Sequence, residues 1–289
     1  MEAIPGMIWR TPSRRFDLTD RALIMGIVNV TPDSFSDGGQ HAGVGDAVAH
    51  ALRLVCEGAD IIDVGGESTR PGAESVSEEE EMARVLPVIR ELRALTDAAI
   101  SVDTMKAAVA DAAMEAGADI INDVSGLHFD AAMAAVAARS GAGLVIMHMQ
   151  GTPRTMQIRP GYGDVLAEVA TALQASMAIA RAAGVPAESI VLDPGIGFGK
   201  RLEDNLAILR SPGSFAVGGR PVLLGASRKS FLGQLTGAAD PAGRDWPTVA
   251  LTCLAREAGV RIFRVHDVRA NAEALRMTEA ILGTRATLS

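Results

Sequence analysis

Polar side chains recur at one repeated position along this chain, the carboxyl end of a short apolar run. Eight such runs follow one another between Leu23 and Asp267. The polar residues that end them are Asn29, Asp63, Asp103, Asn122 with Asp123, His148, Asp193, Ser227 with Lys229, and Arg264 with His266 and Asp267. A (β/α)8 barrel builds its active site on the C-terminal rim of its parallel sheet. We therefore predict an α/β protein with the (β/α)8 TIM-barrel fold and a functional site on that rim.

The length of the chain suits one barrel. A (β/α)8 domain takes about 250 residues, and this chain has 289. We expect a short N-terminal extension over residues 1–20 and a single barrel domain over residues 21–289. The extension is a short strand or hairpin under the barrel, or a loose arm. A doubly wound sheet is the rival architecture, but its ligand residues would gather at one switch point and not along every strand.

Helical periodicity predicts an outer helix in each interval between the apolar runs. We place these helices at about 45–57, 77–95, 106–116, 130–139, 164–183, 203–210, 246–258 and 271–282. Ser77 followed by Glu80 predicts a capping box. We interpret the acidic run 78–81 as the solvated first turn of its helix, where negative charge faces the positive end of the helix dipole.

Composition excludes several classes of protein. A formal charge of -8 argues against nucleic acid as a partner, because phosphate backbones are bound through surplus Lys and Arg. The two cysteines, Cys56 and Cys253, lie in separate apolar helical stretches, so we expect no disulfide. The N-terminus lacks a signal-peptide core, and no run reaches the ~18 apolar residues of a membrane span. We expect a cytoplasmic protein that binds neither nucleic acid nor membrane.

Three strand ends predict a binding site for a flat ring. Residues two apart on a strand share a face, so Asp103, Asn122 and Asp193 converge near the top of a barrel lumen. Two carboxylates and an amide suit a donor-rich heterocycle, such as a guanine-like or pterin ring. They would also suit a metal, although the thiols and paired histidines of a zinc site are missing at useful spacing. Any one of the three could be a satisfied core residue, but three together favour a site.

The basic residues indicate an anionic ligand. The chain has 24 arginines and only three lysines, which are Lys106, Lys200 and Lys229. Two of the lysines follow predicted strands, where a compact charge is useful. For Lys200 a surface position is an equally good interpretation. Arg70, Arg264 and His266 supply charge-assisted donors that suit a phosphate or diphosphate.

Two long connections, 30–43 and 65–77, follow the first two predicted strands. Both are rich in Gly, Ser, Asp and Pro, and one carries Phe35 between two serines. Long loops above a barrel mouth usually act as lids or substrate-binding loops. We expect the same of these two.

Together these segments resemble the dihydropteroate synthase family of the folate pathway. The matching stretches are MGIVNVTPDSFSDGG (25–39), IIDVGGESTRPGA (61–73), SVDT (101–104), INDVSG (121–126), MHMQGTPRTMQ (147–157), LDPGIGFGK (192–200), LGASRKSF (224–231) and RVHDV (264–268). They occur in order through nearly the whole chain. NVTPDSFSDGG and GASRKSF in one chain are specific, whereas a lone VDT would mean little.

The resemblance implies a reaction and a set of site residues. The amine of p-aminobenzoate would displace diphosphate from 6-hydroxymethyl-7,8-dihydropterin diphosphate to give 7,8-dihydropteroate. The implied pterin-diphosphate site comprises Thr69, Arg70, Asp103, Asn122, Met147, Asp193, Gly225, Lys229, Arg264, Val265 and His266, of which Asp103, Asp193, Lys229, Arg264 and His266 would be catalytic. The implied p-aminobenzoate site and its loops comprise Pro32, Asp33, Phe35, Asp37, Ser68, Thr69, Pro71, Phe198, Lys229 and Ser230. Asn29 would ligate Mg²⁺ beside the diphosphate.

The resemblance also implies inhibitors and an assembly. Sulfonamides, which mimic p-aminobenzoate, would compete for its site. The displacement needs no covalent enzyme intermediate, because diphosphate is a good leaving group once its charge is neutralised. Members of the family tend to form homodimers through their last helices, where this chain carries Trp246.

Two other functions remain open at this point. A corrinoid-dependent methyltransferase domain that binds methyltetrahydrofolate would share the barrel and the Asp/Asn cradle, but it has no use for a diphosphate site. A non-catalytic pterin-binding relative should have lost loop residues or the Lys229 and Arg264 pair, and all are present here.

Overall fold

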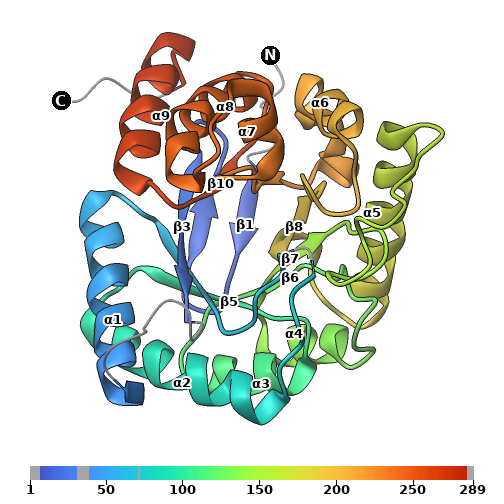
Figure 1. The fold of residues 1–289 in the computed structure, drawn as a ribbon. Helices are drawn as coiled ribbons and strands as arrows, with labels where there is room; N and C mark the ends of the chain where they lie inside the picture. Colours follow the sequence, from blue (N-terminus) through green and yellow to red (C-terminus); the bar gives the residue numbers. More distant parts are fainter. Residues whose placement is uncertain (1–6, 31–38, 71, 285–289) are drawn as a thin grey trace, which may run out of the picture.

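Eight parallel strands form the centre of the molecule, which we describe from a computed structural model covering residues 7–30, 39–70 and 72–284, the side chains of 39–42 excepted. The strands are β3 (Leu23–Asn29), β4 (Ile61–Gly65), β5 (Ala99–Asp103), β6 (Ile120–Asp123), β7 (Gly143–Met147), β8 (Ile190–Asp193), β9 (Leu223–Leu224) and β10 (Ile262–Val265). Their order is β8-β7-β6-β5-β4-β3-β10-β9, so consecutive strands are neighbours. One parallel bridge between Leu192 and Val222 joins the two ends. The sheet is the predicted (β/α)8 barrel (Figure 1).

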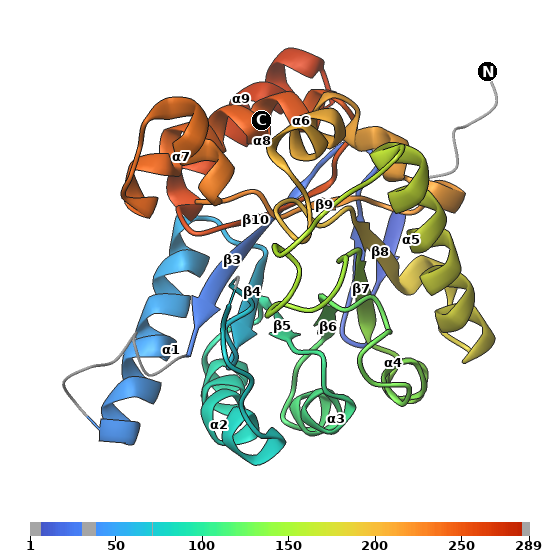
Figure 2. The same ribbon diagram turned by 45° about the vertical axis from the view of Figure 1, so that its right-hand side comes forward.

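Helices surround the barrel on its outside (Figures 1 and 2). They are α1 (Gly39–Glu57), α2 (Glu78–Leu95), α3 (Ala107–Glu115), α4 (Met133–Ser140), α5 (Val165–Ala182), α6 (Leu202–Arg210), α7 (Ser230–Thr236), α8 (Asp245–Glu257) and α9 (Val268–Leu282). Short 3-10 turns lie at Ala187–Ser189, Pro212–Phe215, Val217–Gly219 and Pro241–Arg244. The eight predicted helices are all present, with ends that coincide or differ by at most six residues. The seven-residue α7 was not predicted.

Glu81 corrects the interpretation of the acidic run. Ser77 caps α2 by accepting a hydrogen bond from the Glu80 N–H, as the capping signature predicts. Glu78, Glu79 and Glu80 are exposed, but Glu81 is only 1% exposed and pairs with Lys106. The run is a solvated turn for three residues, and its fourth faces the barrel because α2 turns that side inward.

The N-terminal extension is a hairpin under the barrel. β1 (Ile8–Arg10) pairs antiparallel with β2 (Arg15–Asp17), which selects the hairpin over the loose arm. Trp9 is fully buried, and its indole N–H donates to the carbonyl of Ser189 at 3.0 Å. Its ring belongs to the apolar cluster that fills the lower lumen, with members such as Met25, Ile61 and Val191.

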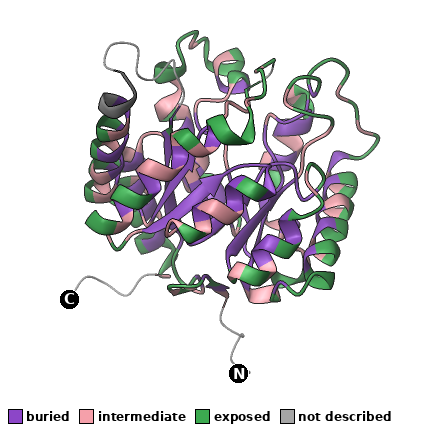
Figure 3. Ribbon diagram, turned by 90° about the horizontal axis from the view of Figure 1, so that it is seen from below, coloured by how far each residue is buried: buried purple, intermediate pink, exposed green. Residues whose placement is uncertain are grey.

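The strands separate two apolar layers. One cluster lies in the lumen, and a larger one lies between the strands and the surrounding helices. Seen from below, the barrel strands are mostly buried and the helices are exposed on their outer faces (Figure 3). Above the lumen cluster, the inward positions near the carboxyl ends of the strands become polar, which creates the upper site.

Two further expectations concern the outer helices. Cys56 and Cys253 are free, as predicted. Among the described residues, α5 alone is long and apolar enough by length and composition to cross a membrane. One face of α5 packs into the outer core through Val165, Val169 and Leu173. Its place in the barrel wall therefore accounts for its apolar side chains.

Candidate active site

Four polar side chains gather at the top of the barrel lumen. Asp103 and Asp193 are the last residues of β5 and β8, Asn122 is next to last in β6, and Asp63 lies in the middle of β4. Each is at least 93% buried. Asp103 and Asn122 are direct partners in the β5–β6 register. The convergence of Asp103, Asn122 and Asp193 that strand alternation predicts is present.

Arg264 links two of these carboxylates. Its Nε donates to Asp63 Oδ2 at 2.6 Å and its Nη2 donates to Asp103 Oδ2 at 2.7 Å. Asn122 Nδ2 also donates to Asp63 Oδ2 at 3.2 Å. The sequence placed Asp63 at the end of an apolar run but did not predict a ligand-binding role for it. The signal was present, because Asp63 shares the inward face of Ile61.

The carboxylates keep acceptors for a ligand. Asp63 Oδ1 and Asp103 Oδ1 are buried without a hydrogen-bond partner within the described part of the chain. Burial raises the pKa of Asp103, although the Arg264 guanidinium opposes this effect. Burial also raises the pKa of Asp193 to about 6, against the Gly195 N–H and the Lys229 ammonium, which favour its ionised form. The lumen can thus offer ionised acceptors near neutral pH to a ring that carries N–H groups.

Lys229 lies across the mouth from these acceptors. Its Nζ is 3.9 Å from the centroid of the Phe198 ring, and such cation–π contacts are favourable. Burial and the Arg264 charge lower the pKa of Lys229 to about 8. The preceding residue, Arg228, has φ of 58°, an uncommon conformation for a residue with a side chain. Two bonds to Asp245, at 2.7 and 2.9 Å, hold it there and so aim Lys229 at the lumen.

His266 is held as a neutral donor beside these cations. The Ser227 hydroxyl accepts the His266 backbone N–H at 3.2 Å and lies 2.9 Å from Nδ1. Burial, with the charges of Arg228, Arg264, Lys229 and Arg70, lowers the pKa of His266 to about 3. If the hydroxyl donates to Nδ1, the proton of the ring is on Nε2, which can donate to an anion. Arg70, Lys229 and Arg264, together with this histidine, suit a diphosphate.

Comparison with known proteins assigns the family. Residues 25–266 match the model of the pterin binding enzyme family. The chain is 46% identical over 266 residues to dihydropteroate synthase from Synechocystis sp., covering 92% of each chain. The chain belongs to the dihydropteroate synthase family. Family membership makes it an enzyme of the transferase class.

Solved structures of dihydropteroate synthase agree in fold. The Yersinia pestis enzyme with a sulfonamide drug complex aligns with a TM-score of 0.90 at 42% identity, covering 96% of this chain and 100% of that one. The Xanthomonas albilineans enzyme with 4-aminobenzoic acid aligns with a TM-score of 0.90 at 45% identity, covering 96% and 98%. The same enzyme in complex with 7,8-dihydropteroate aligns with a TM-score of 0.85 at 42% identity, covering 95% and 98%.

An apolar wall completes the site of this dihydropteroate synthase family member. Met105, Val124, Met147, Met156 and Phe198 form a separate buried cluster above the lumen. Met147 is in direct register with Asp193 across β7 and β8. A flat ring bound to the carboxylates therefore meets polarisable side chains, which adapt to its face.

Lys200 is buried and not on the surface. It is 3% exposed, and its Nζ donates to the carbonyls of Phe198 at 3.1 Å and His148 at 3.3 Å. Burial lowers the pKa of Lys200 to about 7. The surface interpretation of Lys200 was wrong. Because Lys200 holds the Phe198 carbonyl, it supports the ring on which Lys229 rests.

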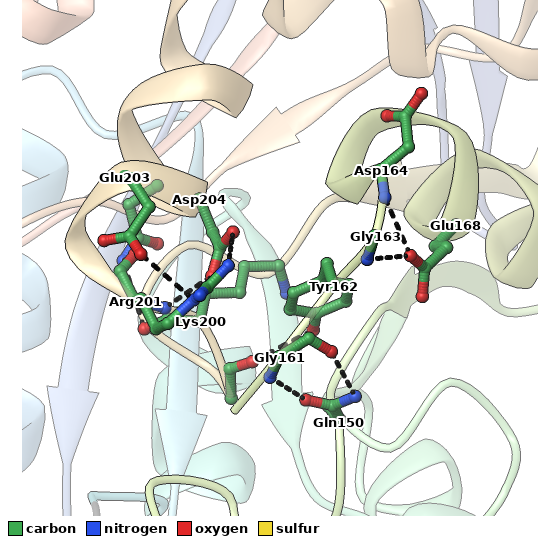
Figure 4. A network of polar contacts seen from close by, with 12 residues as sticks. Gln150, Gly161, Tyr162, Gly163, Asp164, Glu168, Lys200, Arg201, Glu203 and Asp204 are labelled. Carbon is green, nitrogen blue, oxygen red and sulfur yellow. Dashed lines mark hydrogen bonds and ion pairs between the residues drawn. The ribbon is translucent and has the colours of Figure 1, made fainter. Parts of the chain in front are cut away.

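Figure 4 shows how the β7–α5 and β8–α6 connections are joined around Lys200. The Tyr162 hydroxyl donates to the Gly199 carbonyl at 3.0 Å, and Gln150 exchanges two hydrogen bonds of 3.2 Å with the backbone of Gly161. Gly199 has φ of 63°, and a Cβ there would lie 2.6 Å from the Gln150 carbonyl oxygen. Only glycine lets these connections pack so closely.

The remaining predicted site residues occupy different places in the barrel. Gly225 faces the lumen, where an added Cβ would lie 3.7 Å from Asp193 Oδ2. Ser68 and Thr69 are half-buried and Arg70 is exposed in the β4–α2 connection. Val265 points away from the lumen into the outer core, so only its backbone can serve a ligand in the lumen. Ser230 is exposed at the first residue of α7, and Asn29 is exposed at the end of β3.

Five predicted loop residues lie outside the described part of the chain. They are Pro32, Asp33, Phe35, Asp37 and Pro71. Their roles stay predictions.

Proposed function

We propose that this chain condenses 6-hydroxymethyl-7,8-dihydropterin diphosphate with p-aminobenzoate to give 7,8-dihydropteroate and diphosphate. One observation carries the proposal: buried acceptors on Asp103, Asn122 and Asp193 face cationic groups on Lys229 and Arg264 across a single lumen. A donor-rich ring with an attached diphosphate needs both the acceptors, which bind the ring, and the cationic groups, which bind the diphosphate. Relatives in this family have been solved with 4-aminobenzoic acid and with 7,8-dihydropteroate.

The residues divide the work of a displacement without a covalent enzyme intermediate. Ionised Asp103 and Asp193 accept N–H groups of the pterin, and their charge favours the cation that develops at the methylene as its bond to diphosphate breaks. Neutral His266 and the guanidinium groups donate to the departing oxygens. The p-aminobenzoate nitrogen forms the new C–N bond and then loses a proton. The apolar wall of Met147 and Phe198 limits access of water to the cation.

We include Mg²⁺ in the proposal, with Asn29 as its protein ligand. The Asn29 side chain is exposed on the rim, so its amide oxygen is available to an ion. Within the described residues, no group of three or more His, Cys, Asp or Glu side chains could hold a metal. Substrate oxygens and water would therefore complete the coordination shell of the ion, as is usual for Mg²⁺. When bound, Mg²⁺ would neutralise charge on the diphosphate.

We also propose that the protein acts in the cytoplasm as a homodimer that sulfonamides inhibit. A relative has been solved with a sulfonamide drug complex, and the shared site predicts competition with p-aminobenzoate here. The dimer is supported by exposed apolar side chains on α8 and α9, chiefly Trp246, Leu254, Met277 and Ile281. A second copy of this surface would cover them.

A turnover assay tests the proposed reaction. Purified protein, Mg²⁺, the dihydropterin diphosphate and p-aminobenzoate are mixed, and dihydropteroate and diphosphate are quantified. We expect the two products in equal amounts, and we expect Lys229→Ala to lose most of the turnover because the ammonium faces the reacting groups. Tight pterin binding without product would favour a pterin-binding module or a methyltransferase instead.

A further inference from the structure

Lys106 is a buried ammonium for which the proposed reaction has no use. It occupies the N-cap position of α3 without a side-chain capping bond and is 7% exposed. Its Nζ donates to the carboxylates of Glu67 and Glu81, whose side chains are 10% and 1% exposed. Buried ions are costly unless they are paired. These three residues, the Lys106 triad, form a closely paired group of charges behind the site.

The Lys106 triad joins three separate segments at the base of the second loop. Glu67 is the second residue of the β4–α2 connection, Glu81 lies in the first turn of α2, and Lys106 ends the β5–α3 connection. A second cationic side chain holds the neighbouring residue, because Arg84 Nη1 donates to the Gly66 carbonyl at 2.7 Å. The backbone at residues 66 and 67 is therefore held from two sides.

The fixed segment leads directly into residues that face the site. Thr69 follows two residues after Glu67, and Arg70 follows three after it. Thr69 lines a small cavity of about 10 Å³ together with Glu67, Glu81 and Asp103, which leaves room for about one water molecule. The Arg70 charge contributes to the lowered pKa of Lys229 and of His266. The direction in which the chain leaves Glu67 thus decides where Thr69 and Arg70 lie.

We propose that Lys106 is a positioning residue for the diphosphate half of the substrate. By holding Glu67, it sets the second loop so that Thr69 and Arg70 meet the diphosphate, while the pterin ring is bound chiefly by side chains on β5, β6 and β8. This inference rests on the proposed function. Loss of Lys106 leaves two buried carboxylates unpaired, and the base of the loop moves as they separate or become hydrated.

The test compares two ligands that differ only in the diphosphate. Binding of 6-hydroxymethyl-7,8-dihydropterin and of its diphosphate ester is measured by calorimetry for the wild type, Lys106→Met, Lys106→Arg and Glu67→Gln. For Lys106→Met we expect affinity for the ester to fall about 10- to 100-fold, the usual effect of losing an outer partner of a binding group. Affinity for the bare pterin stays close to wild type. Lys106→Arg, which keeps the charge, recovers part of the preference for the ester.

A matched control variant and the wild-type protein distinguish failure of this inference from failure of the proposed function. Glu79→Gln changes an exposed carboxylate in the same turn of α2 and should leave both affinities unchanged. An equal loss for both ligands in Lys106→Met, or no loss for either, overturns the inference. If Lys106→Met does not fold, Glu67→Gln provides the same comparison. A wild-type protein that does not prefer the ester would instead overturn the proposed function.

Discussion

A buried carboxylate serves a donor-rich ring only while it is ionised. At the residue scale, the barrel makes this condition depend on pH, because burial raises the pKa of Asp193 to about 6. The hydrogen bond of 2.7 Å from the Gly195 N–H opposes that effect and keeps the group ionised near neutrality. Asp103 is also shifted upward and relies on its bond to Arg264. At neutral pH Asp193 is therefore mostly ionised, whereas Asp103, whose pKa is raised to about 7, is close to its titration point.

Pterin binding should therefore weaken in mild acid. Each carboxylate is ionised above its pKa and protonated below it, so affinity for 6-hydroxymethyl-7,8-dihydropterin begins to fall near pH 7, where Asp103 titrates, and falls further as the pH drops through about 6, where Asp193 titrates. We expect affinity to fall roughly tenfold per pH unit below that value, since each tenfold change is about 1.4 kcal/mol. The affinity is measured by calorimetric titration at several pH values between about 4.5 and about 7.5, a range that brackets the shifted carboxyl pKa values. Asp193→Asn should bind weakly with a flatter profile, whereas an unchanged pH dependence would assign the titration to another group.

At the element scale, the two ends of the barrel have different tasks. The upper ends of the strands carry the polar site, and the lower lumen is filled by apolar side chains and closed by the β1–β2 hairpin. Functional residues of such barrels lie on the C-terminal face, and the opposite face contributes stability. Trp9 is the largest fully buried side chain of the hairpin, so the hairpin is part of the core.

Trp9→Ala should destabilise the protein without changing its substrate affinity. Loss of a fully buried tryptophan costs about 3–5 kcal/mol of unfolding free energy, and it also removes the donor to the Ser189 carbonyl. The site lies at the other end of the strands, so ligand affinity of the folded protein is retained. Urea unfolding measures the first effect and calorimetry the second. Arg10→Ala is the control, because its pair with Glu188 is exposed and worth less than about 1 kcal/mol. A small effect of Trp9→Ala would show that the hairpin is not part of the cooperative core.

The sequence predicted the elements whose signals are local. Strand alternation placed Asp103, Asn122 and Asp193 in one lumen because an inward position is fixed by a period of two along each strand. The sequence could not predict the burial of Glu81 or Lys200, since each is buried by a segment at least 25 residues away along the chain. Helix α7, with seven residues, is too short for a periodic signal to distinguish it from a loop.

At the scale of the whole molecule, apolar surface is distributed unevenly. Among the described residues, ten large apolar side chains are exposed, and six of them lie between residues 235 and 282. Met277 and Ile281 are one turn apart on α9 and share a face, while Trp246 and Leu254 lie on the neighbouring α8. Helices α8 and α9 pack side by side (Figure 1). Clustered apolar surface of this kind marks an interaction site, and a closed two-fold pairing is the commonest arrangement for one chain.

The homodimer is tested by placing a charge on this surface. Ile281 is 73% exposed, so an aspartate there is tolerated in the monomer but would be buried opposite its symmetry mate in the dimer. We expect light scattering to give twice the chain mass of 30.0 kDa for the wild type and one chain mass for Ile281→Asp. Ile158→Asp is the control, because Ile158 is equally exposed, at 71%, on the β7–α5 connection away from α8 and α9. Turnover per chain should persist in the monomer, because the described site residues all come from one barrel. A wild-type protein that already scatters as one chain would exclude the dimer, and a monomer without turnover would show that the partner completes the site.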